Sequence, residues 1–461
     1  MTKYTRRSLL KNAGLGSLGL SFGPRVFGQS SSDDSREPHF FIEFVVNGGM
    51  DTSYLFDARP RVMTPAGMIQ NYFPEGRKSF EWKGENGQST WASPAMEVLK
   101  PHKDKFSVVN GIIMGTSFDG HGQNTNILLT GNPFGGDSFL PHLSNGDDIP
   151  VDFLLLGNLD AEISNGEASL PLTPELVTQL ANASSGSRTG GTRDQILQRT
   201  YQASSQGGGL LSQGIERMAA GLRQASSIHS KLSQFNTTDL SSETGAVADL
   251  SVALSVFKAQ LSSSAVINLD YFAFDTHDAS SAAQQPSLYE RLASTLSDLI
   301  TKLEDTEFQD GKSFLDVTTF VLTSEFGRTM RQQWKSIGET GTDHNTLSNS
   351  MIVGGKGIAN GHVFGASDLE SVEAFNSPSE HHKKFDSNLL KVMGKPMDFE
   401  TGSVMDPLSM NGKEFNLKQY LSIQSMTNTL LTLFGAQTEN LWRTSSRDEE
   451  SAPILRQLIK K

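Results

Sequence analysis

The side chains that could do chemistry occur in five short polar segments, which lie far apart in the sequence. Each segment combines carboxylates with hydroxyls or imidazoles, and four of the five come just after an apolar run. The segments are residues 48–53, 116–121, 275–278, 324–329 and 341–345. Oxygen and nitrogen donors of these kinds bind divalent cations, which can activate a nucleophile and neutralise an anionic substrate.

Six residues in these segments are predicted to bind metal. Asp275 and His277 are the strongest pair, because alternate residues of an extended chain point the same way. Other readings of single residues stay open: a carboxylate such as Asp51 often caps a turn or helix, and Glu325 with Arg328 could be an ion pair over the sheet edge. The predicted ligands are Asp51, Asp275, His277, Glu325, Asp343 and His344.

The distribution of the histidines favours a shared site. Three of the ten, His121, His277 and His344, fall within the polar segments. His362, which stands between a glycine and a valine, is a reserve candidate. The other six lie near the N-terminus, in loops or in the central region, and we expect no role for them in the site.

The apolar patterns predict the elements that must position these residues. Nearly continuous apolar runs predict strands over 40–46, 106–113, 265–274, 317–323 and 350–353. Leucines three and four residues apart predict a helix over 288–303, with Ser287 and Glu290 as a capping box. A strand, a helix and a further strand imply a right-handed parallel crossover. We therefore expect an α/β fold with a doubly wound, mostly parallel sheet, whose ligands bind beyond the carboxyl ends of the strands.

Residues 176–257 differ in composition from the rest of the chain. They are rich in serine, glutamine, glycine and alanine, and apolar residues recur at helical spacing around 215–232. We predict a Ser-rich helical insertion or cap near the active-site face. A surface excursion with no role in the site is the open alternative.

The first 28 residues are predicted to be a twin-arginine (Tat) signal peptide. Arg6 and Arg7 precede a mildly apolar stretch, and small residues near Gly28 would allow cleavage. That stretch is about half of the roughly 20 apolar residues that a membrane-spanning helix needs, so we expect no integral membrane segment in the mature form. Residues 29–37 are predicted to be a disordered spacer and 38–461 the main domain, exported by the Tat translocase to the periplasm or secreted.

The composition argues against several classes of function. The net charge is −12, and removal of residues 1–28 would take away five basic residues and no acidic one. This charge makes nucleic acids and anionic membranes unfavourable partners. The chain has no cysteine, which excludes disulfides, thiolate nucleophiles and cysteine metal ligands.

Several of these motifs together resemble a bacterial family, the domain-of-unknown-function family 1501. They are Gly-Gly-Met-Asp at 48–51, Phe-Asp-Thr-His at 274–277, Ser-Glu-Phe-Gly-Arg-Thr at 324–329, Asp-His at 343–344 and Gly-Gly at 354–355. The likeness spans nearly the whole chain, and residues 324–329 are its most specific part. That family is placed in the alkaline phosphatase and sulfatase superfamily. The resemblance therefore implies an alkaline-phosphatase-like sheet with one or two metal ions at the strand ends.

The resemblance also implies which residues bind metal. Asp51 matches the superfamily's metal-binding aspartate after the first strand, and Asp275 and His277 resemble the paired ligands of one ion. Residues 325–327 read Glu-Phe-Gly where the superfamily usually has Asp-His-Gly, so one imidazole is missing there. Residues 343–344 either restore that imidazole or supply the late histidine of the first metal site.

On this resemblance, the expected activity is hydrolysis of phosphate esters, and less so of sulfate esters, in small-molecule or glycan substrates. The metal could be zinc, manganese, calcium or magnesium. Ser117, in a Ser-x-x-Gly-His pattern similar to that of cofactor-independent phosphoglycerate mutases, matches the hydroxyl nucleophile. His121 and Arg328 complete the predicted catalytic residues, and Arg328 would stabilise charge on the transferred group. Without cysteine, the standard sulfatase route through a cysteine-derived formylglycine is excluded.

Two other functions stay open at this point. The chain could be a non-catalytic exported binding or assembly protein that retains the alkaline phosphatase fold and one structural metal. It could also be a glycan-modifying enzyme that uses paired carboxylates and needs no metal.

Overall fold

The computed structural model describes most of the main domain. The described residues are 37–58, 62–64, 67–69, 77–115, 120–143, 149, 151–157, 159, 161–163, 170–171, 244–269, 273–329, 341–370, 391–405, 417–436, 442 and 451–460. The predicted signal peptide, nearly all of the predicted spacer and residues 176–243 of the predicted insertion lie outside them. Ser117, the predicted nucleophile, also lies outside the described residues.

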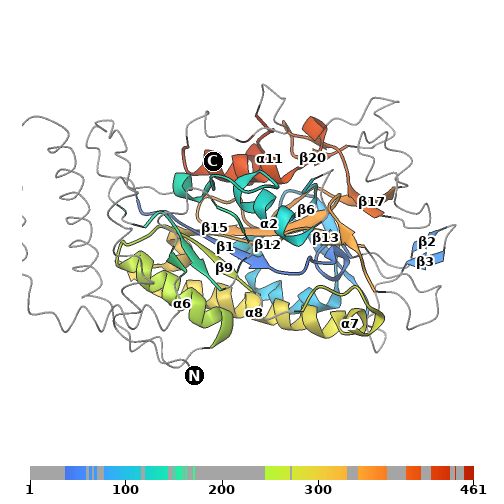
Figure 1. The fold of residues 1–461 in the computed structure, drawn as a ribbon, viewed down its shortest axis with the longest axis horizontal. Helices are drawn as coiled ribbons and strands as arrows, with labels where there is room; N and C mark the ends of the chain where they lie inside the picture. Colours follow the sequence, from blue (N-terminus) through green and yellow to red (C-terminus); the bar gives the residue numbers. More distant parts are fainter. Residues whose placement is uncertain are drawn as a thin grey trace, which may run out of the picture.

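A sheet of eight strands forms the centre of the described structure (Figure 1). Its strand order is β16-β6-β15-β12-β1-β9-β7-β8, and every neighbouring pair is parallel except the two that involve β15. The strands are β1 (Phe40–Val46), β6 (Phe106–Ile112), β7 (Leu154–Leu156), β8 (Leu170–Pro171), β9 (Ser264–Asn268), β12 (Thr318–Ser324), β15 (Asn349–Gly355) and β16 (Val363–Phe364). The predicted α/β class and the mostly parallel sheet are thus confirmed.

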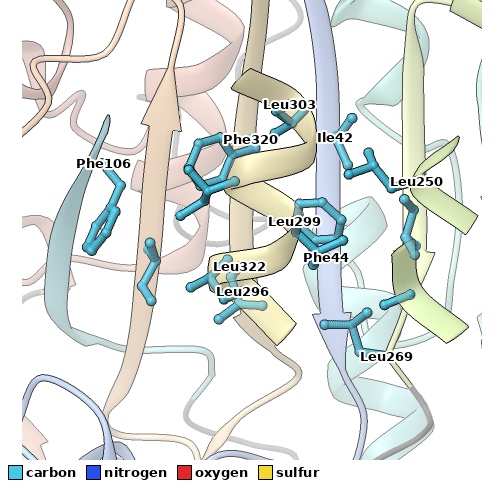
Figure 2. Close-up of a cluster of buried hydrophobic side chains, with 14 of the residues drawn as sticks. Ile42, Phe44, Phe106, Leu250, Leu269, Leu296, Leu299, Leu303, Phe320 and Leu322 are labelled. Carbon is cyan, nitrogen blue, oxygen red and sulfur yellow. The ribbon is translucent and has the colours of Figure 1, made fainter. Parts of the chain in front are cut away.

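Strand β1 is completely buried because helices cover both faces of the sheet. Ile42 and Phe44 face a cluster that includes residues of α6 (Gly245–Lys258) and α8 (Gln285–Asp305), as Figure 2 shows. Phe41 and Val45 face the other cluster, formed with α2 (His121–Thr130) and α11 (Ile423–Leu433). Successive strand residues point to opposite faces, so one continuous apolar run fills both cores.

Helix α8 confirms the predicted leucine face but corrects its start. Leu288, Leu296 and Leu303 are all buried against the sheet. The predicted capping box is wrong, because the helix begins at Gln285 and Pro286 lies in its first turn, where its missing N–H costs nothing. The Ser287 hydroxyl instead donates to the carbonyl of Gln284.

Two predicted boundaries also change. The third strand ends at Asn268 rather than at Phe274, because Phe274 is buried by packing and not by strand pairing. The last part of the predicted insertion is α6, whose buried Leu250 and Leu254 belong to the main core. This segment is therefore part of the helical layer that covers the sheet.

The remaining described elements are short. They are η1 (Thr52–Tyr54), β2 (Val62–Thr64), β3 (Gly67–Ile69), β4 (Phe80–Lys83), β5 (Ser89–Ala92), η3 (Pro94–Lys105), η4 (Leu140–Leu143), α7 (Ala279–Ala283), β10 (Glu307–Gln309), β11 (Lys312–Ser313), α9 (Phe314–Val317), β13 (Gly327–Arg328), β14 (His344–Asn345), β17 (Ser367–Glu370), β18 (Lys391–Gly394), β19 (Met397–Asp398), β20 (Ser403–Val404), η9 (Leu417–Gln419) and η11 (Arg456–Leu458). In the described part of the chain, no helix has the length and apolarity needed to cross a membrane.

Candidate metal centre

The strand directions bring the polar segments to one edge of the sheet, which we call the polar edge. The carboxyl ends of β1, β6, β9 and β12 lie there, because these strands run the same way. Strand β15 runs the opposite way, so the segment that precedes it, 341–345, reaches the same edge. The antiparallel strand therefore adds a fifth segment to a site that parallel strands alone would build from four.

Four side chains on this edge form a group that could hold a metal ion. They are His121, Asp275, His277 and His344, and one ligand atom from each lies within 4.8 Å of all the others. His277 Nε2 is 3.0 Å from His344 Nε2 and 3.1 Å from Asp275 Oδ1, while His121 Nε2 is 3.4 Å from the same oxygen.

The three separations of 3.0, 3.1 and 3.4 Å are close to those expected between ligand atoms of one small ion. Bonds of 2.0–2.1 Å in a tetrahedron place neighbouring ligand atoms about 3.3–3.4 Å apart. The donor set of three imidazoles and one carboxylate suits zinc and similar transition metals better than calcium or magnesium, which prefer oxygen ligands.

His121, the first residue of α2, is held by a buried carboxylate. Its Nδ1 lies 2.7 Å from Oε1 of Glu325, which is 0% exposed, and the N–H of Gly48 donates to the same oxygen at 2.8 Å. The hydrogen bond to Glu325 raises the pKa of His121. If Nδ1 carries the proton, Nε2 offers its lone pair to the group, and Nε2 has no hydrogen-bond partner among the described residues.

Asp275 is held by Arg328, whose side chain is fully buried. The guanidinium donates to Asp275 Oδ1, to the carbonyl of Gly48 at 2.7 Å and to Thr342 Oγ1 at 3.2 Å. Burial by itself raises the pKa of Asp275, but the charges of Arg328, His121 and His277 outweigh it, so this pKa lies below its usual value. With all three of its nitrogens hydrogen-bonded and its side chain fully buried, Arg328 joins Asp275 to Gly48 and Thr342.

Phe326 forms the floor beneath two of the imidazoles. Its ring centroid is 4.3 Å from that of His344 and 4.8 Å from that of His121. Gly49 has a φ of +75°, and a Cβ there would lie 2.4 Å from the Phe326 ring. The glycine therefore leaves room for the phenylalanine ring beneath the two imidazoles.

Of the six predicted ligands, three fall outside the group of four. Glu325 is hydrogen-bonded to Nδ1 of His121, the nitrogen that does not face the group. Asp343 Oδ1 is 4.0 Å from His277 Nδ1 and accepts from the backbone N–H of His344. Asp51 is buried and caps η1 by accepting from the N–H of Ser53, and burial raises its pKa to about 7.

Two predicted residues take other places. His121, predicted as catalytic, is a member of the metal group. His362, the reserve candidate, lies near the start of β6, where its N–H donates to Ser107, and so at the opposite edge of the sheet.

The sequence analysis missed the threonines that brace the segments. The hydroxyls of Thr276 and Thr342 are hydrogen-bonded to each other, with 2.8 Å between the oxygens. The N–H of Thr342 also donates to the carbonyl of Thr276. Each threonine is next to predicted ligands, in Asp-Thr-His and Thr-Asp-His. A threonine beside an aspartate and a histidine in both segments was the sequence feature that could have indicated their pairing.

A family model matches more than half of the chain. The family model described as "Protein of unknown function (DUF1501)" matches residues 172–408, which is more than half of the chain and includes Asp275, His277, Glu325, Arg328 and His344. No curated protein matches the chain. The chain belongs to the DUF1501 family of proteins of unknown function.

Proposed function

We propose that this protein is a metal-dependent hydrolase of phosphate esters, with one zinc-like divalent ion bound by His121, Asp275, His277 and His344. The observation that carries the proposal is the convergence of three imidazoles and a carboxylate within 4.8 Å at the polar edge. Clusters of this kind at the carboxyl ends of strands are where α/β proteins bind ligands and carry out chemistry. The resemblance to the alkaline phosphatase superfamily supports the same reaction class.

A divalent ion held there would supply Lewis-acid chemistry, by polarising an ester oxygen and stabilising negative charge. The chain's own residues prepare the site for it. Glu325 and Arg328 fix His121 and Asp275 through buried contacts. Binding of an ion would therefore cost little further side-chain entropy at these two residues. Asp275 and His277 are about half exposed, which leaves the site open to a substrate from solvent.

Phosphate esters are the preferred substrates because the chain has no cysteine to form the formylglycine of standard sulfatases. Ser117 is the proposed nucleophile, on the strength of its sequence pattern and its position four residues before His121. A serine hydroxyl beside a divalent ion is a common nucleophile for covalent transfer.

The activity can be tested with a panel of chromogenic phosphate monoesters, phosphate diesters and sulfate esters. We expect phosphate ester turnover that chelators abolish and zinc restores, and that falls at least about 100-fold in Asp275→Ala and Ser117→Ala. His102→Ala is the matched control, because His102 bonds Ser297 in α8, away from the polar edge. Turnover that survives both substitutions, or that chelators leave unchanged, would contradict the proposal.

A second function, non-catalytic binding or assembly, is favoured by one specific observation. Three imidazoles and one carboxylate would supply four protein ligands to an ion, the number typical of structural zinc sites, whereas catalytic zinc sites keep one position open. A tightly bound metal together with no turnover of any ester in the panel would favour this alternative.

The twin-arginine pattern supports export of the folded protein with its metal already bound. This part of the proposal is tested by replacing residues 1–28 with a leader for export in the unfolded state. We expect the exported chain to lack the metal. Equal metal content from both routes would mean that the leader specifies location alone.

A further inference from the structure

With four protein ligands, a four-coordinate ion would have no free position for a substrate; the role assigned below to His277 rests on the proposed function. An ester oxygen can reach an ion in the group only if the shell expands or one protein ligand leaves. The four ligands are not equally supported, and the differences among them point to the one that leaves.

Three of the four ligands have a further packed or charged contact outside the group, and for Asp275 this contact is made by Oδ1, the same oxygen that faces the group. His121 is bonded to the buried Glu325 at 2.7 Å, and Asp275 is bonded to the buried guanidinium of Arg328. The His344 ring lies against Phe326, with 4.3 Å between the centroids. Each of these side chains would have to break a packed or charged contact before it could move.

His277 lacks such a support among the described residues. Its side chain is 47% exposed, and its outer nitrogen, Nδ1, is 4.0 Å from Asp343 Oδ1, which is too far for a hydrogen bond. Asp343 is itself 49% exposed. The ring is therefore held mainly by the group itself.

The backbone of His277, by contrast, is firmly held, so only its side chain can move. The carbonyl of the preceding Thr276 accepts from the N–H of Thr342 at 2.8 Å. A Cβ at Gly341 would lie 2.2 Å from the His277 carbonyl, which shows how closely the two segments pack. The following residue, Asp278, caps α7 by accepting from two backbone N–H groups. Release of the imidazole thus requires a rotation about its side-chain bonds and no movement of the segment.

We propose that His277 is the exchangeable ligand of the site, and that an oxygen of the phosphate ester or of the phosphate product takes its place. On a bound ion, one imidazole lone pair would be replaced by one oxygen lone pair, with no change of oxidation state. Asp343 lies within reach as an acceptor for the displaced ring. Three protein ligands would remain, with the fourth position left to the substrate oxygen, the arrangement typical of catalytic zinc.

The test counts imidazoles on the ion in the full chain, by X-ray absorption of the zinc-loaded protein, with and without saturating inorganic phosphate. We expect three imidazoles without phosphate and two with it. His277→Ala should show two under both conditions. Three imidazoles retained at saturating phosphate would overturn the proposal.

Zinc affinity, measured by competition with a chromophoric chelator, gives a second readout that needs no activity. We expect His277→Ala to bind zinc within about tenfold of the unsubstituted chain and His121→Ala to bind it at least about 100-fold more weakly. Equal losses in the two variants would overturn the exchange but leave the metal site intact. An unsubstituted chain that binds no zinc would instead overturn the proposed function. If His277→Ala does not fold, as judged by thermal unfolding, His277→Gln replaces it in both experiments.

Discussion

The polar edge holds two pairs of a histidine and a carboxylate that have the same chemistry and different surroundings. In the first, His121 Nδ1 is 2.7 Å from Glu325, which is completely buried and also accepts the N–H of Gly48. In the second, His277 Nδ1 is 4.0 Å from Asp343, and both side chains are about half exposed. The residue types alone therefore do not decide whether a ligand side chain is held in place. Burial and a second donor to the carboxylate decide it.

The largest effect should come from Gly48, which supports the buried pair with its N–H and Arg328 with its carbonyl. Its φ is +101°, and a Cβ would lie 2.6 Å from the backbone nitrogen of Asp275. We expect Gly48→Ala to lower the free energy of unfolding by about 3 kcal/mol or more, because backbone strain and a backbone clash add together.

Gly311→Ala is the matched control for this prediction. Gly311 has a similar positive φ of +75°, but nothing lies within 4 Å of its added Cβ. It should cost only the conformational strain, about 1–2 kcal/mol. Urea denaturation of both variants checks the difference, and equal losses would mean that the close approach of Gly48 to Asp275 carries no stability.

The next effect compares the two carboxylates directly. Glu325→Ala removes the acceptor for His121 Nδ1 and leaves the Gly48 N–H buried without a partner. We expect zinc affinity to fall by about 10–100-fold, as for other residues that orient a metal ligand. Asp343→Ala should change it less than about threefold, because it removes the acceptor of the His344 backbone N–H but no hydrogen bond to a ligand imidazole. Chelator competition measures both, and the comparison fails if Asp343→Ala is the more damaging change.

The smallest effect is a pH dependence in the metal-free protein. The pKa of His121 is raised above 6.5, so the stability that its charged form contributes is fully present below pH 6.5 and is lost as the pH rises through the folded-state value. Urea denaturation in chelator between about pH 6 and pH 9 should show this decline.

The two carboxylate substitutions separate the cause of this decline. Glu325→Gln should make the curve shallower, because the hydrogen bond to Glu325 is the main reason for the raised pKa of His121. The decline due to burial of Asp51 and Glu43, whose pKa values are raised to about 7 and about 8, should remain. Asp343→Asn should leave the curve as it is. A curve as steep in Glu325→Gln as in the unsubstituted chain would mean that His121 does not contribute to it.

Much of the sheet could be predicted from the sequence because apolar runs report burial. The run at 40–46 matches β1 residue for residue, since a strand covered on both faces is apolar throughout. The same signal misplaced the end of the third strand, because Phe274 is buried without being paired. The antiparallel direction of β15 could not be predicted, because a short apolar segment looks the same in a parallel and in an antiparallel strand.

The residues that form the site could be predicted from the sequence, but their individual roles could not. The strand-end rule predicted that His121, Asp275 and His277 meet, because the carboxyl ends of parallel strands lie at one edge, while His344 reaches that edge ahead of the antiparallel β15. The place of Glu325 behind His121 could not be foreseen, since the two are 204 residues apart and meet only through packing. A glutamate that binds a metal and one that orients a histidine look alike in sequence.

The central claim, a single metal centre at the polar edge, is tested most directly by elemental analysis of the purified chain after extensive dialysis. The account predicts about one zinc-like ion per chain in the unsubstituted protein and in His102→Ala, and much less than one in His121→Ala. The absence of a stoichiometric divalent metal from the unsubstituted protein, or full retention in His121→Ala, would contradict it.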